Sequence, residues 1–265
     1  MCGNQKTFET LEVRKENGIA IVKFNRPQVL NALNLKMREE LLEVMTDLAR
    51  DDGVRVIIFT GAGRAFTSGA DIGDWKAAID GKIKRERNFL VDFVLAFSSL
   101  GKPTIAAVNG PAVGFGFNLT QLCDFVIASE KAIFSPPFVK RGIPPELGST
   151  FILPRTIGFR KARQIMLLGK TLDAYTAKEL GLVDEIVPEE RLMDRCMEIA
   201  RELLENAPLA VRETEKLMWK NLTVSSLEEA LLNERKCADF LYQTEDHKEA
   251  VLAFLEKRKP VFKGK

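Results

Sequence analysis

The sequence predicts an α/β fold. Three observations favour it: short runs that are apolar along their whole length, glycine-rich loops that follow these runs, and helical patterns between them, repeated up to about residue 135. Apolar runs of this kind are typical of strands buried on both faces, and a sheet of such strands needs helices to cover it. The 265 residues are enough for one large domain. We expect a core at residues 1–194 and a helical region at residues 195–265.

Local signals place the elements of the first 76 residues. A turn at Asn17-Gly18 separates two apolar runs, the second of which is rich in β-branched residues. Asn34 can cap a helix whose apolar residues share one face, and Gly53 ends that helix. The predicted order is therefore strands at 8–14 and 18–25, a helix at 34–50, a strand at 54–61 and a loop at 62–76.

Apolar patterns place the later elements in the same way. Phe89, Phe93 and Phe97 recur every four residues, which indicates one helix face that belongs either to the core or to an acyl pocket. Pro208 marks a break before three terminal helices, whose apolar residues could pack on the core or against a partner subunit. The predicted elements are strands at 104–110 and 125–129, a short helix at 115–122, and mostly helix from 145 onward apart from 183–188.

Composition excludes several classes of function. The chain has 39 basic and 37 acidic residues, so a net charge of +2 gives no general attraction to nucleic acid or to a membrane surface. Four separated cysteines form no C-x-x-C pair, and the single histidine, His247, lies near the C-terminus, so no metal site is predicted. The N-terminus has no leader pattern and no apolar run reaches membrane-spanning length, so we expect a cytoplasmic protein.

Two glycine-rich loops follow apolar strands. The first, TGAGRAFTSGADIGDW at 60–75, begins like a dinucleotide-binding fingerprint, but Phe66 replaces the third glycine and no apolar helix follows. The second, NGPAVGFGFN at 109–118, joins a strand to a helix. Backbone N–H groups at such a helix start can hold an anion, and a tight turn packed with glycines is the plainer interpretation.

Several motifs in order along the chain carry a family resemblance. FTSGADIGDW at 66–75 and AVNGPAVGFGFNLTQLCD at 107–124 are similar to the crotonase superfamily of enoyl-CoA hydratases and isomerases. NRPQVLNALN at 25–34 and GKTLDAYTAKELGLVDEIVP at 169–188 also resemble it. The resemblance implies a crotonase spiral of ββα units with a C-terminal helical trimerisation region, assembled as a homotrimer or a dimer of trimers. It further implies an acyl-CoA substrate, with coenzyme A as the acyl carrier and no prosthetic group.

In that family two backbone N–H groups hold the thioester oxygen as it becomes an enolate. Matched onto this sequence, the two donors belong to Ala70 and Phe115. Fixed donors aimed at an oxygen that gains charge stabilise the transition state more than the ground state. The resemblance thus predicts an enolate-stabilising site built from both glycine loops.

The carboxylates of this chain depart from the hydratase pattern. Hydratases carry two glutamates, and the matching positions here are Asn118 and Phe138, neither of which can activate water near neutral pH. Glu146, in GIPPELGST at 142–150, matches the position of the isomerase base. Read without the resemblance, Glu146 could instead be a surface residue at the start of a helix. An isomerase needs only one base, and an apolar wall would raise the pKa of that carboxylate.

The resemblance also implies contacts for the rest of the substrate. Its coenzyme A part is expected beside two short segments and two C-terminal residues, although Leu30 could equally belong to the core. The C-terminal residues could come from a neighbouring subunit. The expected coenzyme A contacts are Gln28, Val29, Leu30, Thr67, Ser68, Gly69, Phe254 and Lys257. The expected pocket residues are Asp71, Trp75, Phe93, Phe97, Gly114, Asn118 and Phe138.

The predicted function is an enoyl-CoA isomerase that moves a double bond from position 3 to position 2, with Glu146 as the base and the Ala70 and Phe115 amides as donors. Another crotonase-type reaction remains an alternative, namely hydration, dienoyl-CoA isomerisation or thioester hydrolysis. A non-catalytic acyl-CoA-binding scaffold is a further alternative. Turnover of a 3-enoyl-CoA distinguishes the enzyme from the scaffold.

Overall fold

A computed structural model describes residues 7–83 and 89–265 of the chain. Its main sheet has six strands in the order β1-β2-β3-β4-β6-β9. The first two strands are antiparallel, and every other neighbouring pair is parallel. The strands are β1 (Leu11–Glu16), β2 (Ile19–Phe24), β3 (Val56–Gly61), β4 (Thr104–Val108), β6 (Phe125–Ser129) and β9 (Glu185–Val187).

A second, smaller sheet lies beside the first and has the order β5-β7-β8. Its strands are β5 (Pro111–Val113), β7 (Ile133–Ser135) and β8 (Leu172–Asp173). The strand β5 follows β4 almost directly, so the second glycine loop crosses from one sheet to the other. The next helix then starts at Phe115, directly after β5.

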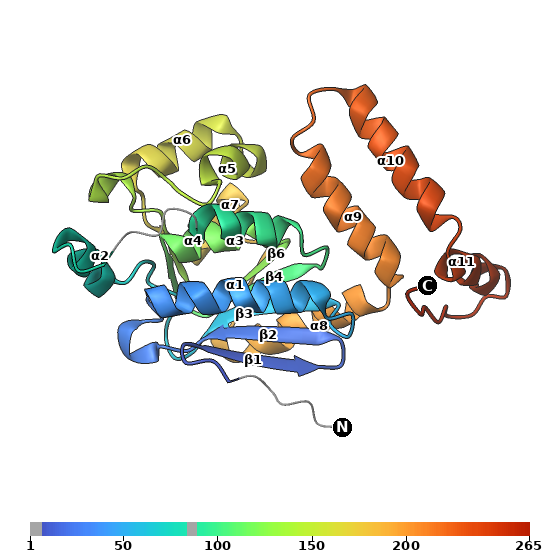
Figure 1. Cartoon of the computed structure of the whole chain (residues 1–265), viewed down its shortest axis with the longest axis horizontal. Coiled ribbons are helices and arrows are strands. Elements are labelled where there is room, and N and C mark those ends of the chain that lie inside the picture. The colour runs from blue at the N-terminus through green and yellow to red at the C-terminus, as the bar shows by residue number, and fades with distance from the viewer. Residues whose placement is uncertain (1–6, 84–88) are drawn as a thin grey trace.

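Helices cover both faces of the main sheet (Figure 1). On one face α1 (Leu35–Arg50), α3 (Phe89–Ser98) and α4 (Phe115–Leu122) enclose the larger apolar core, which is rich in phenylalanine. On the other face α8 (Leu192–Leu204) packs Cys196, Ile199 and Ala200 against β3, β4 and β6. The strands therefore have apolar side chains on both sides, as their continuous apolar runs predict.

Four shorter helices complete the body of the molecule. They are α2 (Ile72–Ile79), α5 (Ser149–Ile157), α6 (Phe159–Leu168) and α7 (Ala174–Leu180), and single 3-10 turns lie at Pro27–Val29, Val139–Arg141 and Glu189–Arg191. Figure 1 shows α2 at one end of the body, with α5 and α6 above α4. The helices α4 and α5 are in contact, which brings the segment before α5 close to the second glycine loop.

The C-terminal helices form an arm at the opposite end from α2 (Figure 1). The arm consists of α9 (Pro208–Asn221), α10 (Leu227–Leu241) and α11 (Glu245–Leu255), and α10 packs along α9. Many of its large apolar residues are exposed, among them Leu227, Leu231, Phe254 and Leu255. The expected boundary between residues 194 and 195 falls inside α8, which packs on the sheet, so the projecting arm begins at α9.

The structure confirms the α/β prediction. Asn34 caps α1 by accepting a hydrogen bond from the Met37 amide at 2.9 Å, as the sequence predicts. The predicted loop at 62–76 is wrong at its end, because α2 begins at Ile72 with Asp71 as its N-cap. The two-residue and three-residue strands of the small sheet are also missing from the prediction, since runs so short give no periodic signal.

Candidate active site

The two glycine loops lie side by side and are joined through their backbones. The Thr67 amide donates to the Pro111 carbonyl at 3.0 Å, and the Val113 amide donates to the Thr67 carbonyl at 2.9 Å. Thr67 and Ala112 thus form an isolated parallel bridge. Segments more than 40 residues apart in the sequence therefore meet at one place.

Two glycines allow the loops to approach this closely. Gly69 has φ +87° and Gly114 has φ +55°, both in the left-handed region that favours glycine. A Cβ on Gly69 would lie 2.8 Å from the Val113 oxygen and 3.6 Å from the Gly114 Cα. The backbones of residues 69 and 114 are therefore in direct contact. Ala70 and Phe115 are the next residues in the chain, so their amides lie close to this contact.

The amides of Ala70 and Phe115 are available as donors. Phe115 is the first residue of α4, and the first N–H groups of a helix have no acceptor within it. Ala70 forms a parallel bridge with Leu33 in which the Gly69 oxygen and the Asp71 amide make the hydrogen bonds. Within residues 7–83 and 89–265 neither amide has a protein acceptor. Two adjacent free N–H groups, one at the positive end of a helix dipole, suit a developing oxyanion.

The Phe115 side chain packs in an aromatic cluster, away from solvent. Its ring centroid lies 5.5 Å from that of Phe93, 6.3 Å from that of Phe89 and 6.4 Å from that of Phe24. Phe97 extends the cluster, stacking on Phe59 at 6.0 Å. Phe93 and Phe97 thus belong to the core, and contact of either with an acyl chain stays a prediction.

The segment expected to contact coenzyme A lies along the first glycine loop. The Ser68 amide donates to the Leu30 carbonyl at 2.9 Å, and the Ser68 hydroxyl faces the Val29 carbonyl at 3.4 Å. Val29 is exposed, and Leu30 is half-buried with φ +53°. The structure therefore brings together residues 28–30 and 67–69, which the resemblance alone had associated.

Sequence reasoning missed the residue that holds this arrangement. Asn31 is fully buried, and its Nδ2 donates to the Ala62 and Ala65 carbonyls at 2.9 and 2.8 Å. Its Oδ1 accepts from the Arg26 amide at 2.9 Å, and its carbonyl accepts from the Thr67 hydroxyl at 2.7 Å. The positive φ that this residue adopts, +57°, is one that asparagine tolerates better than most residues.

Glu146 lies in a turn tied to the second glycine loop. The Asn118 Nδ2 donates to the Glu146 carbonyl at 2.9 Å, and Ser149 donates to the same oxygen from its hydroxyl at 2.8 Å and its amide at 3.1 Å. Glu146 itself is half-buried. Leu147 and Gly148 follow with φ +52° and +70°, so two consecutive left-handed residues reverse the chain here. The predicted base is thus fixed to the helix that presents the Phe115 amide.

The remaining predicted pocket residues are held by contacts of their own. Phe138 is buried at the start of the 3-10 turn, and its carbonyl accepts from the Arg141 amide at 2.9 Å. The Arg141 guanidinium lies 5.5 Å from the ring centroid of Trp75 in α2. Asp71 caps α2 and pairs with Arg26 at 2.8 Å, so its carboxylate holds the loop in shape.

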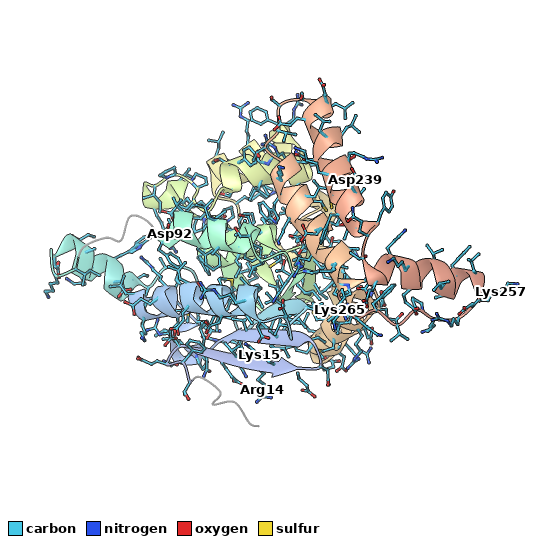
Figure 2. The ribbon with its side chains drawn as sticks, turned by 45° about the vertical axis from the view of Figure 1, so that its right-hand side comes forward. Arg14, Lys15, Asp92, Asp239, Lys257 and Lys265 are labelled. Carbon is cyan, nitrogen blue, oxygen red and sulfur yellow. The ribbon has the colours of Figure 1, made fainter. Side chains whose placement is uncertain are left out.

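Phe254 and Lys257 lie far from these residues within one chain. Phe254 is exposed on α11, and Figure 2 shows Lys257 at the outer end of that helix, pointing away from the body. A contact of either residue with this chain's own glycine loops is therefore not formed. Their expected role in binding coenzyme A requires the site of another subunit.

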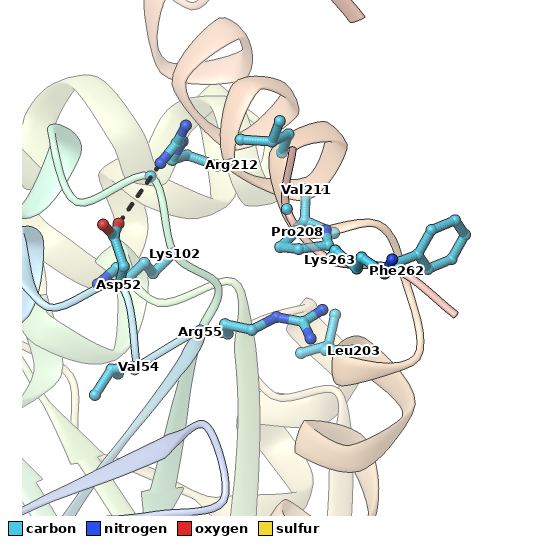
Figure 3. A pocket seen from close by; sticks show the side chains of 13 residues that line it. Asp52, Val54, Arg55, Lys102, Leu203, Pro208, Val211, Arg212, Phe262 and Lys263 are labelled. Carbon is cyan, nitrogen blue, oxygen red and sulfur yellow. Dashed lines mark ion pairs between the residues drawn. The ribbon is translucent and has the colours of Figure 1, made fainter. Parts of the chain in front are cut away.

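Other features lie apart from the glycine loops. A cavity of about 420 Å³ between the core and α9 is lined by Arg55, Lys102 and Arg212 among others, and none of the predicted site residues lines it (Figure 3). In the described ranges no group of three or more His, Cys, Asp or Glu is arranged to hold a metal ion. The described helices include none with the length and apolarity needed to cross a membrane.

Comparison with known proteins places the chain in a family. The family model for enoyl-CoA hydratase/isomerase matches residues 14–265. A probable enoyl-CoA hydratase of Mycobacterium tuberculosis is 37% identical over 97% of this chain and 98% of its own length. A short-chain-enoyl-CoA hydratase of Clostridium acetobutylicum is 37% identical over 93% of this chain and 95% of its own.

Solved structures agree with these relatives. An enoyl-CoA hydratase subunit I from Geobacillus kaustophilus superposes with a TM-score of 0.88 at 38% identity, over 97% of this chain and 99% of that one. An enoyl-CoA hydratase from Bacillus anthracis gives a TM-score of 0.88 at 32% identity, over 97% and 100%. The predicted crotonase fold is thereby confirmed, and the chain belongs to the enoyl-CoA hydratase/isomerase family.

Proposed function

We propose that this enzyme shifts a double bond of an acyl-CoA from position 3 to position 2, with Glu146 as its single base. One observation carries the proposal: a carboxylate-bearing residue, Glu146, is bonded through its backbone to the helix that presents the Phe115 amide. The two positions matched to the hydratase acids hold Asn118 and Phe138, both buried and neither acidic. We infer that the Glu146 carboxylate is the proton acceptor that acts with the pair of amide donors.

The chemistry follows from these groups. Glu146 removes a proton from C2 of a 3-enoyl-CoA, and the electrons of the broken C–H bond delocalise onto the thioester oxygen. The Ala70 and Phe115 amides donate to that oxygen, which carries most of the charge in the dienolate. Glu146 then returns the proton to C4, and the double bond is left between C2 and C3. The overall reaction needs no water, oxidant or metal ion.

Hydration is the second candidate, and the names of the relatives favour it, since several are called hydratases. Hydration needs a group that removes a proton from water and a group that delivers one to C2. Glu146 alone would have to perform both steps, because Asn118 and Phe138 cannot. We therefore propose hydration as at most a slow side reaction of the same site.

The remainder of the substrate is assigned in the same way. We propose that coenzyme A lies along residues 28–30 and 67–69, where the exposed Gln28 and Val29 adjoin the half-buried Ser68. The exposed apolar residues of α10 and α11 support assembly into a trimer or a dimer of trimers. In such an assembly Phe254 and Lys257 could reach the nucleotide of a neighbouring subunit.

Turnover of two substrates tests the proposal. The purified enzyme is given a 3-enoyl-CoA in one reaction and a 2-enoyl-CoA in another, and the products are separated by chromatography. We expect kcat/KM for isomerisation to exceed that for hydration at least about 100-fold, the usual contribution of one well-placed acid or base. Hydration at a rate equal to or above isomerisation would overturn the proposal in favour of the hydratase.

A further inference from the structure

The buried side chain of Asn118 is the link between the amide donor and the base. Asn118 is 1% exposed and lies in α4, and its Nδ2 donates to the Glu146 carbonyl at 2.9 Å. Phe115, whose amide begins the same helix, lies three residues earlier, which is about 4.5 Å along the helix axis. One rigid helix turn therefore connects the proposed enolate donor to the residue that carries the base.

The turn that carries Glu146 needs such an anchor. Leu147 adopts a left-handed backbone with φ +52° although it is not glycine and its side chain is buried. A residue of this kind is strained and persists only where its surroundings hold it. Ser149 supplies two donors to the Glu146 carbonyl from within the same turn, and Asn118 supplies a donor from another element, α4.

The side-chain oxygen of Asn118 indicates that this residue does more than fill space in the core. Its Oδ1 is buried and has no hydrogen-bond partner within the described part of the chain. Rotating the amide would place this acceptor against the Glu146 carbonyl and would leave Nδ2 unpaired instead, so the orientation is set by the need for a donor. An apolar side chain of similar size would fill the same space without leaving a polar atom unpaired.

We propose that Asn118 is a positioning residue, which holds the Glu146 turn at a fixed distance from the Phe115 amide. This inference rests on the proposed function, because it assumes that Glu146 is the base. It also gives a physical reason for an amide at a position matched to a hydratase acid. An ionised carboxylate at residue 118 could not donate to the Glu146 carbonyl and would add a second negative charge near the base.

Three substitutions test this role. Asn118→Asp and Asn118→Leu keep the size of the side chain and remove the donor. Thr120→Val is the matched control, since the Thr120 hydroxyl is buried in the same helix and donates to the Phe117 carbonyl at 2.8 Å rather than to the Glu146 carbonyl. We expect both Asn118 variants to lower kcat for isomerisation at least about tenfold with KM within threefold. The Thr120 variant should lose as much Tm as the Asn118 variants but keep kcat within about threefold of the unmutated value.

A second assay separates this inference from the proposed function. Exchange of the C2 protons of a saturated acyl-CoA with D2O requires the base and the amide donors and no double-bond shift. If the unmutated enzyme exchanges these protons but does not isomerise, and Asn118→Asp and Asn118→Leu lower the exchange rate, the isomerase proposal fails and the positioning role stands. Asn118 variants with unchanged kcat and exchange, and with a Tm loss like that of Thr120→Val, would show a purely structural residue and overturn the inference. An unmutated enzyme that neither isomerises nor exchanges would overturn both.

Discussion

Two carboxyl groups, one on the body of the molecule and one on the helical arm, give a pH-dependent prediction. Asp124, just before β6, accepts hydrogen bonds from the Thr104 amide and hydroxyl, both at 2.7 Å. Glu215, on α9, accepts from the Trp219 indole at 2.9 Å, and burial together with the charge of Asp124 raises its pKa. Burial and the negative charge of the neighbouring carboxyl group both favour the protonated form of Glu215. The pair therefore binds a proton that the unfolded chain releases.

The sign of the effect follows from the raised pKa. Burial and the neighbouring Asp124 raise the pKa of Glu215 from 4.5 to about 7. Between these values the folded state holds the proton and the unfolded state does not, so the free energy of unfolding falls as pH rises from 4.5 to 7 and levels off above it. Each pKa unit corresponds to about 1.4 kcal/mol. Asp124 remains open to water, and screening reduces the full effect to about 1–2 kcal/mol.

Glu215→Gln removes this proton dependence and keeps the contacts. The amide oxygen can still accept from Trp219, and the amide nitrogen can donate to an ionised Asp124. At pH 8 we expect the variant to melt about 2–6 °C above the unmutated protein, from the usual scaling of Tm with stability. Near pH 4.5 the difference in Tm should shrink to about a degree or less. At that pH the Glu215 carboxyl of the unmutated protein approaches protonation in both the folded and the unfolded state.

Thermal melts followed by circular dichroism at fixed protein concentration measure this difference. Glu213→Gln is the matched control on the same helix, because Glu213 pairs with Arg212 and Lys216 at 3.4 and 3.6 Å and loses attraction when it is neutralised. The control should melt at or below the unmutated protein at pH 8. A Glu215→Gln offset in Tm that is the same at both pH values would refute the raised pKa of Glu215.

Three further predictions concern the site and the assembly. Ala70→Pro removes one amide donor and should lower kcat about 100-fold or more. Phe115→Leu keeps its backbone N–H, so its kcat should stay within tenfold of the unmutated value. Equal losses of kcat in the two variants would contradict the donor assignment. Gly69→Ala places a Cβ 2.8 Å from the Val113 oxygen at φ +87°, whereas the Cβ of Gly81→Ala, at φ +71°, has nothing within 4 Å. We expect Gly69→Ala alone to lose acyl-CoA binding, measured by calorimetry. Sedimentation should give three or six times the chain mass of 29.7 kDa, and an active monomer at micromolar concentration would rule out the trimer.

The sequence predicts best those features that depend on neighbours along the chain. The N-cap at Asn34 and the apolar face of α1 are local signals, and both are confirmed. The start of α2 is not predicted, although Asp71 before Ile72 and Asp74 in the first turn are signals of a helix start that could have revealed it. The glycine-rich composition of that stretch favours a loop and hides these signals.

Contacts between segments that are distant in the sequence cannot be predicted from such local signals. The bond from Asn118 to the Glu146 carbonyl joins residues 28 apart, and Asn31 clamps a loop that begins about 30 residues later. No spacing rule relates such pairs, since their meeting depends on how the two sheets and α5 pack. The resemblance names the residues expected at the site, and the structure adds how the turn with Glu146 is held.

The most direct test of the central claim is the rate of isomerisation by Glu146→Gln. Glutamine keeps the size of the side chain and the backbone carbonyl to which Asn118 and Ser149 donate, so the turn is retained. The side chain can no longer accept a proton. We expect acyl-CoA affinity, measured by calorimetry, to stay within a few fold while kcat for the 3-enoyl-CoA falls at least about a few hundredfold. A folded Glu146→Gln enzyme that isomerises 3-enoyl-CoA at the unmutated rate would contradict the account.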